Sequence, residues 1–488
     1  ILLYLNNNNK YIYIIYMKIP FESYDTFVLD TENYKDTSSF FIGNCFIDTD
    51  VIIGRNGYLD YLKNMNDNKN VFSPQEGRYI YFNKDTIRSD YFGLMPLFYY
   101  KSNKYFAISN SFIVLIQFLR KKGIILTINN DAILITRYPA TYLNSQPFMN
   151  TLCKEINIVP TFEYIQIING SLILKNVLDE NISNKNYKET LNEYIEIMAS
   201  RINTIIDSKL FNIQSDLSGG LDSRGILSVL LNIKTPSCFT VVLKEENGNP
   251  ALGRDNEIAQ ELVNKHNLKH INDNGKFKIA STGLNCAKGL SYSFFKNHYI
   301  GQNYKLLSIP GIVDPTLIGF HGGAGEIYKH SQFINENFIN STLLKKITPN
   351  TEKLIMDTYN NRHISLKGLH LNLYTYIMGR NRFHYGNHLR FVDNTFFLYP
   401  SIKLLQTLNF EEGNNIQHDI MQISYPELLR TQFDSDYKNF KGIINDRYNK
   451  IKVKLGKVYI DISSQKNKYD ILESNNIDWW NDAKIDIH

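Results

Sequence analysis

The sequence predicts a layered α+β domain, followed by an α/β domain with a doubly wound parallel sheet and a helical C-terminal part. In residues 17–178, short apolar runs alternate with turn residues, a pattern typical of antiparallel sheets. From residue 187 onward, helical periodicities alternate with continuous apolar runs, which is typical of parallel strands covered by helices. The length of 488 residues supports this division, because one hydrophobic core rarely extends over so long a chain.

The first half contains several apolar and aromatic runs of strand length. Residues 111–121 differ from them, because their apolar side chains recur at helical spacing, so we expect a helix there. The pairs Asn56-Gly57 and Asn169-Gly170 are turn-forming and predict turns. Strands are expected at residues 39–42, 51–53, 78–82, 97–100, 105–108 and 164–168.

The second half, residues 187–488, follows a polar stretch at 179–186 that we expect to link the two domains. One long amphipathic helix is predicted by the helical spacing of Leu191, Tyr194, Ile195, Met198, Ile202, Ile205 and Ile206. Further strands are expected at residues 211–217, 237–243 and 269–271, with helices at 226–233 and 255–266 between them. Beyond about residue 330 the pattern is mostly helical.

The most informative segment is Ser218-Gly219-Gly220-Leu221-Asp222-Ser223, which joins an expected strand to an expected helix. The backbone N–H groups and the positive end of the helix dipole make such a junction an anion site, and phosphate is the usual anion. Glycines let the backbone approach the anion closely, and the two serines add hydroxyl donors. Asp222 would repel a phosphate unless a metal ion lay between them, so it indicates Mg²⁺. The alternative is an ordinary glycine turn.

This loop is not the G-x-x-x-x-G-K-[ST] phosphate loop, because no lysine follows its second glycine. It resembles the Ser-Gly-Gly-x-Asp-Ser pyrophosphate-binding loop of the N-type ATP pyrophosphatases, which cleave ATP between the α and β phosphates. The resemblance implies that residues 218–223 hold ATP and its pyrophosphate.

The composition argues against several classes of function. The net charge is only +5 and the basic residues are scattered, so we expect no nucleic-acid partner. The four cysteines are far apart and lack metal-binding spacing, and we expect them to be reduced thiols in the cytoplasm. No apolar run comes close in length to the about 18 residues that a membrane-spanning helix needs. Residues 1–16 are apolar and Asn-rich, and are expected to be a non-native or disordered leader before Met17.

The first half resembles the asparagine synthetase family. Gly77-Arg78 opens a strand, residues 90–100 are similar to the D-x-F-G-x-x-P-L-Y-Y segment of that family, and residues 106–110 are similar to its F-A-S-E strand end. The resemblance implies a glutamine-amidotransferase-like domain of the N-terminal-nucleophile fold at 17–178. In that family the glutaminase uses a cysteine at the mature N-terminus. Lys18 follows Met17 and Cys45 is internal, so we expect the glutaminase to be inactive and the domain to be degenerate.

In the second half the resemblance implies a HUP-like ATP pyrophosphatase domain at 187–488. Residues 238–243 are similar to the strand whose backbone contacts adenine, which makes Val242 an ATP contact. Residues 319–326 are similar to the glycine-rich segment G-x-G-G-D-E, which implies ATP contacts at Gly322 and Gly323. Gly325-Glu326 stands in place of Asp-Glu, so Glu326 is expected to be the second Mg²⁺ carboxylate beside Asp222. The alternative is a glycine loop with a solvated glutamate.

The substrate side departs further from the family. Residues 393–405 lack the Glu and Arg of the E-x-R-x-P-F-L-D segment, so the acid/base group beside the substrate stays unassigned. Residues 425–435 are similar to the stretch before the catalytic lysine, which implies that Lys438 or Lys441 stabilises charge on the α-phosphate. Solvated lysines are the alternative.

The family resemblance implies an ATP- and Mg²⁺-dependent, AMP-forming amide ligase. Its partners would be a small-molecule or peptide carboxylate and an amine or ammonia, and the oligomeric state stays open. A catalytically inactive nucleotide-binding or scaffold protein is the alternative, motivated by the lost Asp and Glu. A third reading, tRNA thiolation, would need catalytic cysteines that the sequence does not offer.

Overall fold

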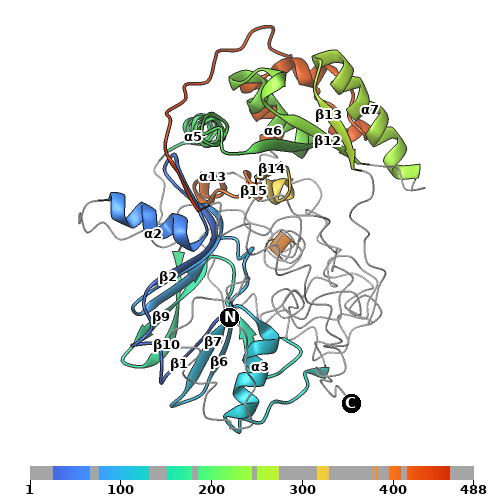
Figure 1. The fold of residues 1–488 in the computed structure, drawn as a ribbon. Coiled ribbons are helices and arrows are strands. Elements are labelled where there is room, and N and C mark those ends of the chain that lie inside the picture. The colour runs from blue at the N-terminus through green and yellow to red at the C-terminus, as the bar shows by residue number, and fades with distance from the viewer. Residues whose placement is uncertain are drawn as a thin grey trace.

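The computed structural model describes residues 26–65, 76–130, 151–177, 185–244, 250–273, 316–328, 377, 381–382, 395–407 and 415–461. Within these residues the fold is mixed α/β, with sheets of four, seven and five strands. The five-stranded sheet and its helices lie at the top of Figure 1, and the two other sheets lie at the bottom. This mixed α/β content, with several sheets of which one is parallel, is compatible with the layered α/β architecture that the sequence predicts.

The first half, together with one strand from the C-terminal part, forms two sheets that pack face to face. The antiparallel four-stranded sheet has the order β1 (Val28–Asp30), β7 (Phe106–Ser109), β6 (Phe98–Lys101), β8 (Ile156–Ile158). The seven-stranded sheet has the order β10 (Ser171–Asn176), β9 (Glu163–Ile168), β5 (Thr86–Ser89), β4 (Gly77–Asn83), β2 (Phe40–Ile47), β3 (Asp50–Ile53), β16 (Val458–Ile460). Phe40 and Phe82 of one sheet share a buried cluster with Phe106 and Ile108 of the other. Each of the six strands expected in this half falls on one of these elements.

The two expected turns have different outcomes. Asn169-Gly170 connects β9 to β10 with positive φ at both residues, 51° and 72°, as a tight hairpin requires. The turn at Asn56-Gly57 is wrong, because both residues lie inside helix α2 (Gly54–Asn64). Gly57 serves close packing, since a Cβ there would overlap the carbonyl oxygen of Tyr459 in β16 and lie 2.8 Å from its carbon.

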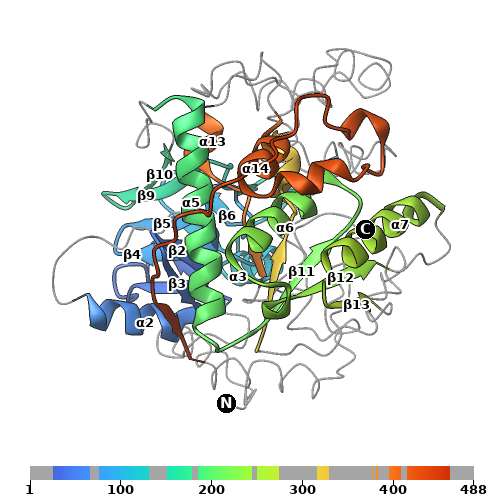
Figure 2. The same cartoon turned by 90° about the horizontal axis from the view of Figure 1, so that it is seen from above.

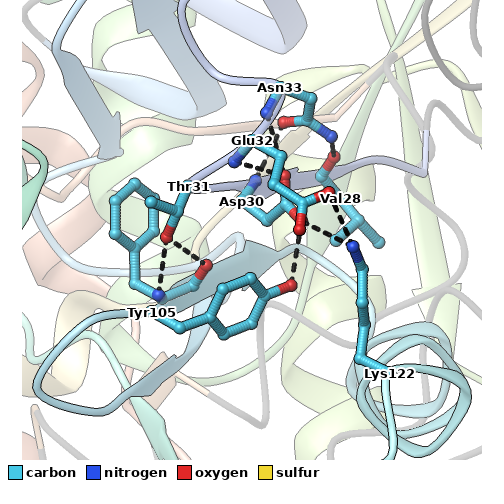
Figure 3. Close-up of polar contacts among 8 residues, drawn as sticks. Val28, Asp30, Thr31, Glu32, Asn33, Tyr105 and Lys122 are labelled. Carbon is cyan, nitrogen blue, oxygen red and sulfur yellow. Dashed lines mark hydrogen bonds and ion pairs between the residues drawn. The ribbon is translucent and has the colours of Figure 1, made fainter.

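A buried carboxylate closes one edge of the four-stranded sheet (Figure 3). Asp30, which is 1% exposed, accepts hydrogen bonds from the backbone of Glu32 and Asn33 (both 3.0 Å) and from the hydroxyl of Tyr105 (2.8 Å). Lys122 lies 3.9 Å from it, just beyond helix α3 (Phe112–Lys121). These partners satisfy the carboxylate, so the cluster is structural. The helix expected at residues 111–121 is confirmed, with Ser111 as its N-cap.

The five-stranded sheet is parallel throughout, as expected. Its order is β13 (His270–Asp273), β12 (Thr240–Lys244), β11 (Asn212–Leu217), β14 (Leu317–His321), β15 (Thr395–Phe397). The chain leaves β11 toward β12 and later returns to its other side as β14. The segments that follow β11 and β14 therefore lie side by side at the carboxyl edge, where ligands bind in open parallel sheets.

Helices cover this sheet. The elements are α5 (Tyr187–Asp207), α6 (Leu221–Ile233), α7 (Pro250–His266), α13 (Ile402–Thr407) and α14 (Ile416–Ser424). The long helix predicted before the loop is α5, and six of the seven apolar residues that predicted it are buried. It begins with a capping box, in which Asn186 and Glu189 bond each other's backbone N–H groups. Figure 2 shows α14 above α6, and the two helices pack together.

One of the buried hydrophobic clusters contains residues from both halves. The rings of Phe46 on β2 and Phe396 on β15 lie 5.1 Å apart. Arg201 of α5 forms an ion pair with Glu76 (2.8 Å) and donates to the carbonyl oxygen of Asp48 (2.8 Å). Arg382, which is 1% exposed, donates from Nε to the carbonyl oxygen of Gly93 (2.9 Å). Apolar packing and buried cations therefore hold the halves together.

The chain after α14 returns to the first half as an extended segment, residues 441–460, which we call the strap. It passes along α5 to α2 and β3 in both views (Figures 1 and 2). Side chains of α5 hold it: Ser200 Oγ accepts from the N–H of Lys454 and Thr204 Oγ1 from that of Gly456 (both 2.9 Å). Its end forms β16, which pairs in parallel with β3.

Several expectations fall outside the described residues. They are the leader at 1–16, most of the linker at 179–186, and most of the helical pattern beyond residue 330. Among the helices that the structure describes, none has both the length and the apolar character needed to cross a membrane.

Candidate functional site

The loop at residues 218–223 lies at the carboxyl end of β11 and leads into α6, as predicted. The hydroxyl of Ser223 accepts from the N–H of Ser218 (3.0 Å), and that of Ser218 accepts from the N–H of Gly220 (3.1 Å). Gly220 is the N-cap of α6 and, as a glycine, has no side chain with which to cap the first N–H groups of the helix. Leu221 is buried in the core, which anchors the first turn. The loop therefore presents an uncapped helix N-terminus at the sheet edge, which suits an anion.

Asp222 is held at both its backbone and its side chain by distant parts of the sequence. Tyr399, just after β15, donates from its hydroxyl to the carbonyl oxygen of Asp222 (2.8 Å). A Cβ at residue 225 would overlap that hydroxyl and lie 3.3 Å from Cζ, so Gly225 makes room for Tyr399. Gln417 of α14 donates from Nε2 to Asp222 Oδ1 (2.8 Å). The carboxylate therefore has a defined position.

The second glycine-rich segment follows β14 and contacts the first loop. A Cβ at Gly322 would lie 2.8 Å from both the carbonyl carbon of Asp222 and the nitrogen of Ser223. A Cβ at Gly325 would overlap Asp222 Oδ1 and lie 2.8 Å from Cγ. The two loops that the sequence singled out separately thus meet at Asp222, and this contact needs glycine at both positions.

His321 orders the start of this second segment. Its Nδ1 accepts from the N–H of Gly323 (2.7 Å), and its Nε2 lies 2.9 Å from Asp216 Oδ2 on β11. With Nδ1 as an acceptor, a neutral ring carries its proton on Nε2, beside the carboxylate of Asp216. Gly323 is therefore fixed by a local hydrogen bond.

Asp222 and Glu326 supply oxygen ligands of the kind that Mg²⁺ takes. Glu326 lies in a short 3-10 helix, η5 (Gly325–Tyr328), and is half-buried. Burial, together with the negative charges of Asp222 and Glu326, raises the pKa of Tyr399 well above its ordinary value, so both carboxylates act on the same hydroxyl. Mg²⁺ is usually held by one or two carboxylates plus phosphate oxygens and water. Within the described residues no three His, Cys, Asp or Glu side chains are grouped for a metal ion, so this pair would need phosphate oxygens to complete a site.

Arg224 ties the loop to the C-terminal part of the chain. It is fully buried and donates to the carbonyl oxygen of Gly219 (3.1 Å). It also donates to three carbonyl oxygens in and just after the 3-10 helix η10 (Pro426–Arg430), those of Leu428 (3.3 Å), Thr431 (2.8 Å) and Gln432. Its guanidinium lies 3.9 Å from the ring centre of Phe433. Burial lowers the pKa of Arg224 to about 10, which leaves the side chain charged at neutral pH.

The segment that Arg224 holds brings Lys438 close to the loop. The N–H of Asp434 donates to the carbonyl oxygen of Gly219 (3.2 Å), and the carboxylate of Asp434 binds Lys438 Nζ at 2.9 and 2.7 Å. His418 of α14 fixes the backbone, with its Nε2 2.8 Å from the carbonyl oxygen of Lys438. Lys441 lies on the exposed stretch that follows. Of the two candidate lysines, Lys438 is the one tied to the loop.

The expected adenine side lies on β12. Val242 pairs in register with Asp216 of β11 and is half-buried, whereas its neighbours Val241 and Leu243 belong to the core. On the same side of the loop, Gly219 packs against Asp255 of α7, whose Oδ1 would lie 3.0 Å from a Cβ at residue 219. The carboxyl end of β12, the loop and α7 therefore lie next to one another.

Three residues of this arrangement were not predicted from the sequence: Arg224, Tyr399 and Gln417. Arg224 carries a signal, since it is a charged residue among the apolar residues of α6 directly after the loop. Tyr399 and Gln417 carry none, because their partner Asp222 is more than a hundred residues away in sequence.

A comparison with known protein families found no family model that matches this chain, and no curated protein matched it either.

Proposed function

We propose that this protein is an ATP- and Mg²⁺-dependent, AMP-forming amide ligase of the asparagine synthetase type, with a HUP-like ATP domain and a first half of the N-terminal-nucleophile type. The observation that carries the proposal is the meeting of three separately expected elements at Asp222 and Gly219. They are the Ser218–Ser223 loop, the Gly322–Glu326 segment and the Lys438 segment. A structural glycine turn would not need a second glycine loop packed against its carboxylate.

The reaction would run in two displacements at one site. A substrate carboxylate oxygen attacks the α-phosphorus of ATP, forming an acyl-adenylate and releasing pyrophosphate. An amine then attacks the acyl carbon, forming the amide, releasing AMP and losing one proton to a base that the family resemblance leaves unassigned. The chain's contribution would be positioning and charge stabilisation, because the attacked phosphorus carries negative oxygens.

The main predicted residues would have the following roles in this scheme. The N-terminus of α6 and the hydroxyls of Ser218 and Ser223 would hold the pyrophosphate. Asp222 and Glu326 would hold Mg²⁺, which neutralises phosphate charge when bound. Lys438 would leave Asp434 and stabilise the α-phosphate, and the edge of β12 at Val242 would contact adenine.

The first half would have no glutaminase of its own. Cys45 lies on β2 with a fully buried side chain, and burial raises the pKa of its thiol well above the ordinary value. A nucleophilic cysteine needs the opposite, a lowered pKa and access to substrate. Free ammonia or a substrate amine would therefore accept the acyl group from the acyl-adenylate.

The alternative is a nucleotide-binding or scaffold protein without catalysis. Gly325 in place of an aspartate and the tight Asp434–Lys438 pair favour it. Such a protein would bind Mg-ATP and never release pyrophosphate, so one assay separates the two functions.

The test is titration calorimetry followed by pyrophosphate exchange. We expect the wild type to bind Mg-ATP with micromolar affinity, and Asp222→Ala to bind it about tenfold or more weakly. A panel of carboxylates is then screened for exchange of labelled pyrophosphate into ATP. Exchange that Asp222→Ala abolishes supports the ligase, binding without any exchange supports the scaffold, and a wild type that does not bind ATP contradicts both.

A further inference from the structure

Gln417 occupies an unusual position at the meeting point of the two loops. It is fully buried near the start of α14. Its Nε2 donates both hydrogens, one to Asp222 Oδ1 and one to the carbonyl oxygen of Gly325 (both 2.8 Å). Its Oε1 has no hydrogen-bond partner within the described residues. A buried acceptor without a partner is costly, so it marks a place where a donor belongs.

The amide of Gln417 lies against Asp222 beside residue 325, where there is no room for a further side chain. A Cβ at that position would overlap Asp222 Oδ1 and lie 3.2 Å from Gln417 Nε2. The carboxylate of Asp222 and the amide of Gln417 therefore fill the space into which a side chain at residue 325 would extend. The neutral amide of Gln417 orients Asp222, so the site carries less negative charge than it would with a carboxylate at residue 417.

We infer that Gln417 is the positioning residue of the Mg²⁺ site. It orients Asp222 through Nε2 and offers Oε1 to a water molecule on the metal ion. Mg²⁺ keeps several of its waters in proteins, and each of them is a strong donor. Because Oε1 and Nε2 share one carbon atom, this acceptor lies next to the carboxylate that would hold the ion. The inference rests on the proposed function.

This arrangement has a consequence for the order of binding. With Asp222 and Glu326 as its only predicted carboxylates, the site would bind a free divalent ion weakly. The phosphates of ATP would supply the missing charge, so metal and nucleotide would bind together. Mn²⁺, which shares the oxygen preference of Mg²⁺ and is visible by electron paramagnetic resonance, reports this directly.

The experiment compares Gln417→Met with the wild type and with Gln422→Met, a half-buried glutamine on the same helix whose amide bonds Ile443 in the strap and not the two loops. ATP affinity is measured by calorimetry with Mg²⁺ and with EDTA, and Mn²⁺ binding by resonance with and without ATP. We expect Gln417→Met to weaken Mg-ATP binding about 10- to 100-fold and to change ATP binding in EDTA by less than about threefold. Gln422→Met should match the wild type in both, and the wild type should bind Mn²⁺ only with ATP.

A second variant keeps the test decisive if the methionine protein does not fold. Gln417→Asn keeps the amide but shortens the side chain by one methylene, so its donor and acceptor withdraw from Asp222 and Gly325. Its Mg-ATP affinity should therefore fall about tenfold or more, with ATP binding in EDTA changed by less than about threefold. Unchanged Mg-ATP affinity in both variants would overturn the role of Gln417 alone. A wild type that does not bind Mg-ATP at all would overturn the proposed function with it.

Discussion

Replacing Arg224 with methionine should detach the C-terminal segment from the loop. Methionine keeps much of the buried length and removes every donor. Three carbonyl oxygens of residues 428–432 would lose their partner, whereas that of Gly219 would keep the N–H of Asp434.

The size of this effect can be worked out from the contacts. Each buried acceptor left without a donor costs about 1–3 kcal/mol, and the lost contact with the ring of Phe433 adds about 1–2 kcal/mol. Gln432 is exposed, so water can reach its carbonyl, and such terms are not additive. We therefore expect a loss of about 3–5 kcal/mol in the free energy of unfolding, a large share of the stability of a typical domain.

The assay is chemical denaturation followed by circular dichroism, with hydrogen exchange measured by mass spectrometry over residues 426–440. The matched control is Arg430→Met in the same segment, whose side chain is 41% exposed and pairs with Glu427 and Asp446. This control should lose no more than about 1 kcal/mol. If Arg224→Met costs less than about 1 kcal/mol and leaves exchange unchanged, Arg224 does not hold the segment.

Three further predictions concern the loops and the first half. Gly325→Ala should weaken Mg-ATP binding about tenfold or more in calorimetry, because its Cβ would overlap Asp222 Oδ1. The control Gly319→Ala should bind Mg-ATP like the wild type, because its Cβ would lie 3.4 Å from Thr395. Burial raises the pKa of Asp90 from 3.8 to about 6, so between these pH values the folded state binds more protons than the unfolded state. The free energy of unfolding should therefore fall by up to about 3 kcal/mol as pH rises from 4 to 6. Asp90→Asn should lack this pH dependence when denaturation is measured at a series of pH values. Tyr105→Phe removes the hydroxyl that binds Asp30 and should lower the free energy of unfolding by about 1–2 kcal/mol, and a loss below about 0.3 kcal/mol would contradict the structural role of this cluster.

The parts of the fold that the sequence predicted are those whose signal is local. β11, the loop and α6 follow one another within residues 212–233, so the strand pattern, the glycines and the helical periodicity lie next to one another in the sequence. α5 was equally clear, because its apolar residues repeat over many turns. The binding of pyrophosphate by this loop, by contrast, is expected from a family resemblance and stays a proposal.

The parts that could not be predicted depend on contacts between distant residues. β16 has three residues, too few for a recognisable alternation, and its partner β3 lies about four hundred positions earlier. Asn56-Gly57 looked like a turn because its glycine is needed for the approach of this strand. Tyr399 and Gln417 reach Asp222 from other elements, so nothing near Asp222 in the sequence announces them.

The return of the strap to the first half sets the order in which the protein can be completed on the ribosome. β3 pairs with β2 on one side and with β16 on the other, so its outer backbone groups stay open until residue 460 has left the exit tunnel. An open strand edge is a template for pairing with another chain. Nascent chains that have emerged only as far as the parallel sheet would therefore be the species most prone to aggregate, and slow translation of the last hundred residues would prolong their exposure.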